Sequence, residues 1–98
     1  MTTSPLQQLL QDKKPEILKL ADQYGVTDIR VFGSVARGED TENSDIDLLI
    51  NLERKGFSDW CCFWADVKET LNHDVDVIPE KNLHWFIKPQ ILEEAKPL

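Results

Sequence analysis

Cysteine is scarce in this 98-residue sequence, and long apolar runs are missing. The two cysteines, Cys61 and Cys62, are adjacent. Adjacent cysteines rarely bridge each other, so no disulfide framework is expected. No apolar run approaches the length that spans a bilayer, and the N-terminus lacks the basic start and apolar stretch of a secretion signal. These absences predict no membrane segment and favour a reducing, cytoplasmic location.

Basic residues are also few. The sequence has 11 Lys and Arg against 18 Asp and Glu, which gives a net charge of -7, and the basic residues form no dense cluster. Proteins that hold the nucleic-acid backbone need a basic face. We therefore expect no extended contact with DNA or RNA. A nucleoside triphosphate is still compatible with this charge, because a metal ion can supply the positive charge that the chain lacks.

The chain is too short to hold two domains. A protein of this size buries roughly 60–65% of its unfolded surface, which supports one modest core. We predict a single domain over residues 1–98, with a frayed N-terminal segment at residues 1–14. Little room is left for a separate substrate domain, so an enzyme of this size would have an open site or one completed by a partner.

The pattern of apolar residues predicts an α+β fold. Short apolar stretches predict three strands, at residues 28–32, 46–52 and 74–78. Apolar residues at helical spacing predict three helices, at residues 15–24, at residues 58–71 and after Pro89. This order predicts a small mixed sheet covered by helices on one side.

A glycine-serine turn followed by paired aspartates is the most informative motif. Gly33 and Ser34 follow an apolar strand and precede Asp45-Ile46-Asp47. A turn at the end of a strand can offer backbone N–H groups and a hydroxyl to phosphate. Two carboxylates at i and i+2 share one face of a strand, and a shared cation most simply relieves their repulsion. The motif therefore predicts metal-assisted phosphoryl or nucleotidyl transfer.

Asp76 is the third candidate ligand. It lies between Val75 and Val77, so the valines would face the core and Asp76 the opposite side. If its strand lies beside the strand of Asp45 and Asp47, three carboxylates converge on a site for Mg²⁺, with two ions expected. Alternatively, Asp45 caps a turn while the other two are solvated. Strand interiors disfavour aspartate, which makes this alternative the weaker one.

Arg37 has two equally weighted interpretations. It binds a phosphate, or it pairs with Glu39 and Asp40. Ser34 taken alone would be a turn hydroxyl that satisfies local backbone, but its place between Gly33 and the acid pair favours phosphate contact. Gly33, Ser34 and Arg37 are thus the candidate nucleotide-binding residues.

The aromatic residues at helical spacing, Trp60, Phe63 and Trp64, are interpreted as core rather than as a cofactor stack. A small domain with this much aromatic surface can also leave part of it exposed for a partner.

From Gly33 to Asp47, with Asp76 downstream, the chain resembles the minimal nucleotidyltransferases, the smallest members of the DNA polymerase beta superfamily. The segment GSVARGEDTENSDIDLLI is close to the family's pattern, and the tail ILEEAKPL is similar to its closing helix. The resemblance implies a nucleotidyltransferase fold, a short mixed sheet flanked by helices. It further implies that Gly33 and Ser34 hold nucleotide phosphates. Asp45 and Asp47 would bind both Mg²⁺ ions, and Asp76 would be the third ligand and the acid nearest the attacking group.

Many members of this family are antitoxins encoded beside a HEPN-domain ribonuclease toxin. The resemblance implies transfer of AMP from ATP to a tyrosine of such a toxin. All three acids are present, so nothing indicates an inactive enzyme. Two alternatives stay open: the protein masks its partner without catalysis, or it transfers a nucleotide to a small molecule. The short chain disfavours the second, because no further domain remains to hold that acceptor.

Overall fold

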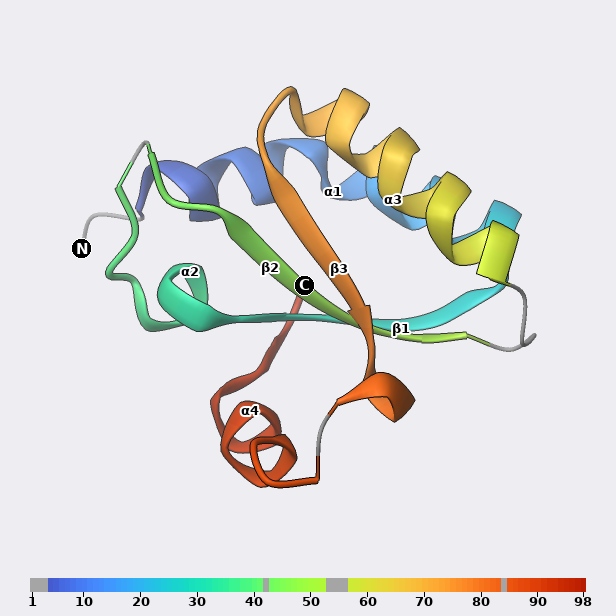
Figure 1. Cartoon of the computed structure of the whole chain (residues 1–98). Coiled ribbons are helices and arrows are strands. Elements are labelled where there is room, and N and C mark those ends of the chain that lie inside the picture. Colours follow the sequence, from blue (N-terminus) through green and yellow to red (C-terminus); the bar gives the residue numbers. More distant parts are fainter. Residues whose placement is uncertain (1–3, 42, 53–56, 84) are drawn as a thin grey trace.

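A four-stranded sheet with the order β3-β2-β1-β4 organises the chain. The computed structural model describes residues 4–41, 43–52, 57–83 and 85–98 (Figure 1). Strand β1 is antiparallel to β2 and to β4, whereas β2 and β3 are parallel. The strands are β1 (Val26–Phe32), β2 (Ile46–Leu52), β3 (Val75–Pro79) and the two-residue β4 (Lys96–Pro97). The expected mixed sheet is therefore confirmed, with one short strand more than predicted.

Helices lie on both faces of the sheet. Two long helices cover one face and α4 lies on the other, beside α2 (Figure 1). The expectation of helices on one side alone was therefore wrong. The helices are α1 (Pro5–Tyr24), α2 (Gly33–Arg37), α3 (Phe57–Leu71) and α4 (Lys88–Glu94), and the 3₁₀ turn η1 (Glu80–Asn82) follows β3. No helix within the described ranges is both long and apolar enough to cross a membrane.

Alternation along β2 separates the core from the functional face. Ile46, Leu48 and Ile50 are fully buried in the core cluster beneath α1 and α3. Because successive side chains point to opposite faces, Asp47 points to the side on which α4 lies. The sheet thus has an apolar face that stabilises the fold and a second face that carries carboxylates.

The N-terminal segment differs from prediction. Residues 5–14 belong to α1 rather than to a frayed tail, and residues 1–3 lie outside the described ranges. The helix starts at a capping box in which Ser4 accepts from the Gln7 N–H at 3.2 Å, while the Gln7 side chain accepts from the Ser4 N–H. Leu6 and Leu10 are 4% and 2% exposed, so this turn is held by the core. Pro15 lies within α1, on an exposed stretch.

Two tryptophans of α3 protect the outer edge of the sheet. β3 is an edge strand, and such strands present unpaired carbonyl groups. The indole N–H of Trp60 donates to the Val77 carbonyl at 2.7 Å, and that of Trp64 donates to the Val75 carbonyl at 2.6 Å. These side chains, expected to be core, pack against the core and are half-buried.

We expect Trp64→Phe to lower the free energy of unfolding by about 1–2 kcal/mol, because it removes the hydrogen bond to Val75 together with packing area. Urea denaturation measures the change. Trp85→Phe is the control: Trp85 is 77% exposed, so the same substitution should change stability by less than about 0.5 kcal/mol. Equal losses in the two variants would show that the bond to the strand edge contributes nothing.

Candidate active site

Strand register brings the predicted acids together. Phe32, the last residue of β1, is paired with Asp47 on β2, and Asp47 is paired with Asp76 on β3. Asp45 immediately precedes β2. Asp45 and Asp76 are exposed and Asp47 is half-buried. The three acids thus gather at the end of the sheet where β1 finishes and β2 and β3 begin, level with the turn that follows β1.

The pKa of Asp47 is raised by burial and by the acids around it. Burial raises it most, and the neighbouring carboxylates of Asp76, Asp45 and Glu94 raise it further, to about 6. Arg37 acts in the opposite direction and does not outweigh them. Negative charge is therefore in excess at this end of the sheet, as expected where a cation is to be bound.

The acids have the ligand chemistry that a hard cation needs, but their side chains are not arranged as a coordination site. Within the described ranges, no three His, Cys, Asp or Glu side chains already form a set that could hold a metal ion. Carboxylate oxygens are nevertheless the ligands that Mg²⁺ prefers, and after burial it is the neighbouring carboxylates of Asp76, Asp45 and Glu94 that raise the pKa of Asp47. Asp45 and Asp76 are exposed, so their side chains can rotate toward Asp47. Their role as metal ligands stays a prediction.

The turn at Gly33 requires glycine for two reasons. Its φ is +74°, in the left-handed region, and a Cβ placed there would lie 2.3 Å from Oδ2 of Asp47. The backbone of α2 therefore starts in direct contact with the acid cluster. Ser34 follows within α2, half-buried, and its hydroxyl makes no hydrogen bond to any residue that the structure describes. The structure therefore places Gly33 beside Asp47, with Ser34 one residue further along in α2.

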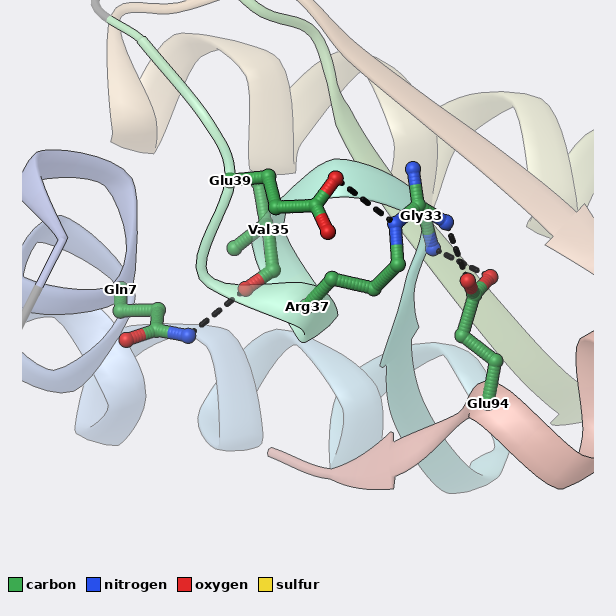
Figure 2. Close-up of polar contacts among 6 residues, drawn as sticks. All are labelled: Gln7, Gly33, Val35, Arg37, Glu39 and Glu94. Atoms are coloured by element: carbon green, nitrogen blue, oxygen red, sulfur yellow. Dashed lines mark hydrogen bonds and ion pairs between the residues drawn. The ribbon is translucent and has the colours of Figure 1, made fainter.

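Arg37 makes ion pairs with two carboxylates (Figure 2). It contacts Glu39 at 3.4 Å and also pairs with Glu94 of α4, whose carboxylate accepts the Gly33 N–H at 2.9 Å. The expected pairing with Glu39 is present, but that with Asp40 is not: Asp40 instead accepts the Leu6 N–H at 3.2 Å, at the start of α1.

Glu94 is a site residue that sequence reasoning missed. Burial acts to raise the pKa of this carboxyl, but the hydrogen bonds from Gly33 and Arg37 outweigh burial and lower it. The same contact with Glu94 raises the pKa of Arg37. The tail of the chain resembled a closing helix, but no local pattern indicated that its glutamate reaches a glycine 61 residues away.

Two further contacts fix the segments that carry the site residues. The Gln7 side chain of α1 donates to the Val35 carbonyl at 2.7 Å, which fixes α2 against α1 (Figure 2). An imidazole nitrogen of His73 lies 2.6 Å from the Ser44 carbonyl, immediately before Asp45. A cleft of about 720 Å³ opens beside that aspartate. It is lined by Asn43, Asp45, Ala65, Lys68, Glu69, Asn72, His73 and Asp74.

A mixed sheet that carries a glycine-serine turn level with aspartates on adjacent strands defines a nucleotidyltransferase. The nucleotidyltransferase domain family matches residues 14–98, so the chain belongs to that family. The resemblance, the fold and the enzyme class predicted from the sequence are thereby confirmed.

The chain is similar to proteins of the same class. A candidate protein adenylyltransferase of Methanocaldococcus jannaschii is 46% identical over 95 residues, which cover 95% of this chain and 94% of that protein. A solved structure of a candidate minimal nucleotidyltransferase aligns with a TM-score of 0.83 at 36% identity, over 93% of this chain and 94% of the other. A toxin-antitoxin crystal structure with AMP-PNP aligns with a TM-score of 0.72 over 86% of this chain and 70% of the other. At 22% identity, that last likeness shows the fold alone.

Proposed function

We propose that this nucleotidyltransferase is an antitoxin that transfers AMP from Mg²⁺-bound ATP to a tyrosine of a HEPN-type toxin. The register of Phe32, Asp47 and Asp76 carries the proposal, because it sets a phosphate-binding turn level with two acids on neighbouring strands. The candidate adenylyltransferase among its relatives supports adenylyl transfer. A toxin-antitoxin structure with AMP-PNP shares this fold and motivates the choice of nucleotide and partner class in the proposal.

The nucleotide phosphates are held, in this proposal, by the Gly33 N–H, the Ser34 hydroxyl and the Arg37 guanidinium. Asp45, Asp47 and Asp76 hold two Mg²⁺ ions, which when bound supply positive charge to the phosphates. These three side chains offer oxygen ligands at the end of the sheet where negative charge is in excess.

The acceptor hydroxyl then attacks the α-phosphorus of ATP. A bond forms between the tyrosine oxygen and phosphorus, the bond to the β-phosphate oxygen breaks, and pyrophosphate leaves. Asp76, exposed at the rim, takes the hydroxyl proton. The cleft beside Asp45 offers a route for the partner's segment, since Asp45 is one of the residues that line it.

Masking of the toxin without catalysis is a second candidate, and one observation favours it. Trp85 and Phe86, just before α4, are 77% and 74% exposed. Exposed aromatic surface of this kind is typical of protein–protein contact. The patch lies before α4 rather than on α3, where the sequence suggested it. Masking and transfer can operate together.

The test is to mix the chain, Mg-ATP and the toxin encoded beside it, and to weigh both proteins by mass spectrometry. We expect an AMP-sized increment on the toxin that maps to a tyrosine and is lost with Asp76→Asn. Glu93→Gln, an exposed acid of α4, is the control variant and should transfer normally. A complex that neutralises the toxin equally well with Asp76→Asn and leaves no increment would replace transfer with masking.

A further inference from the structure

One carboxylate of the protein binds the groups that are proposed to bind phosphate. Glu94, the last residue of α4, accepts the backbone N–H of Gly33 at 2.9 Å and pairs with the guanidinium of Arg37 (Figure 2). Both donors belong to the set assigned above to the nucleotide phosphates. A carboxylate and a phosphate seek the same partners, because both are anionic and accept charge-assisted hydrogen bonds.

One backbone N–H cannot serve both anions at full strength. While Glu94 accepts from Gly33, a phosphate oxygen at that position would face a second negative charge as well as an occupied donor. The carboxylate of Glu94 already acts to raise the pKa of Asp47, so it is close enough to add to the acid cluster electrostatically. Glu94 therefore opposes nucleotide binding both by contact and by charge.

The contact is one that a ligand can displace. The side chains of Arg37 and Glu94 are 47% and 21% exposed, so the ion pair between them is partly open to solvent, and ion pairs screened by solvent are weak. The chain that follows α4 is held against β1. Lys96 and Pro97 pair with β1, and the Leu98 N–H donates to the Ile29 carbonyl at 3.2 Å. Because this restrains the backbone near Glu94, release of the contact falls to the Glu94 side chain. Rotation of the Glu94 side chain alone frees both donors.

We infer that Glu94 is an internal competitor of the nucleotide, a residue that occupies the phosphate-binding donors until a polyphosphate displaces it. The inference rests on the proposed function, since it assumes that Gly33 and Arg37 bind phosphate. It makes Glu94 a determinant of nucleotide affinity located outside the acid cluster. The opposite role would be that Glu94 positions Arg37 for phosphate, and the two roles predict opposite signs for its removal.

Calorimetric titration of the full chain with Mg²⁺ and AMP-PNP, and separately with Mg²⁺ and tripolyphosphate, decides between them. Glu94→Gln removes the charge and keeps the shape, so both ligands should bind about threefold to tenfold more tightly than to wild type. Glu93→Gln removes the same charge one residue earlier, at an exposed position, and should leave both affinities unchanged. In the ligand-free protein, the amide resonance of Gly33 should shift in Glu94→Gln and stay in place in Glu93→Gln.

Three results would overturn the inference. Wild-type binding with an equal or weaker affinity in Glu94→Gln would make Glu94 neutral or a positioning residue, and would leave the proposed function intact. An equal gain in Glu93→Gln would reduce the effect to net charge. Failure of every variant to bind either ligand would remove the proposed function, and the competitor with it.

Discussion

Asp47→Asn is expected to abolish nucleotide binding and, in the absence of metal, to make the fold more stable. The pKa of Asp47 is raised from 3.8 to about 6, so the folded protein holds this proton more tightly than the unfolded chain does. The favourable contribution of protonated Asp47 to the free energy of unfolding is therefore fully present below the ordinary pKa of 3.8 and is lost as the pH rises through about 6. At neutral pH, the ionised carboxylate destabilises the free protein.

The gain in stability is modest, whereas the loss of binding is large. The full shift corresponds to about 3 kcal/mol at 1.36 kcal/mol per pKa unit. Because Asp47 is half-open to solvent, screening reduces the expected gain of Asp47→Asn to about 1–2 kcal/mol at pH 7. The gain should shrink toward zero as the pH falls to about 3, below the ordinary pKa of 3.8, because the carboxyl is then protonated in both the folded and the unfolded state. Urea denaturation without metal at the two pH values measures it.

Calorimetry with Mg²⁺ and AMP-PNP should show no binding to Asp47→Asn under conditions in which wild type binds. Asp22→Asn, an exposed acid on α1 in the opposite layer, serves as the control and should show neither the pH-dependent gain nor the loss of binding. A less stable Asp47→Asn at pH 7 would contradict the expectation, because the carboxylate would then contribute favourably to the fold. An acid that costs stability in the free protein is typical of a site selected for a ligand.

The strands of the site could be predicted because their signals are local. Residues 46–52 form β2 with the predicted bounds, and the alternation that buries Leu48 also turns Asp47 to the other face. The first strand begins at Val26, two residues earlier than expected, since Gly25 directly caps the preceding helix. Local periodicity thus predicts the elements well and their ends less well.

Contacts between distant segments could not be predicted. The start of α1 carries a local signal in the capping box of Ser4 and Gln7, but the burial of Leu6 and Leu10 that holds it depends on a core built by later strands. The ion pair of Arg37 with Glu94 joins residues that only the return of the chain through β4 brings together. Such contacts depend on the completed fold, so a pattern within one segment cannot contain them.

Gly33→Ala is the second substitution with a large expected effect, and it should reduce activity far more than it reduces the stability of the fold. The new Cβ would lie 2.3 Å from Oδ2 of Asp47, far inside contact distance. That oxygen is the tip of a half-buried side chain, so the clash is relieved by rotating the Asp47 carboxylate away. The displaced acid leaves the position at which it faces the phosphate turn, and displacement of about 1 Å in a catalytic group can cost a hundredfold in rate.

Gly38→Ala provides the matched control. Gly38 has nearly the same φ, +72°, and among the residues that the structure describes its Cβ would meet nothing closer than the Gln7 side chain at 3.8 Å. Both alanine variants should lose about 1–2 kcal/mol of stability to the left-handed backbone. Only Gly33→Ala should lose adenylyl transfer to the toxin, by about a hundredfold or more, as followed by mass spectrometry. Similar transfer rates in the two variants would show that the contact between Gly33 and Asp47 does not set the position of the acid, and that the turn contributes only its backbone conformation.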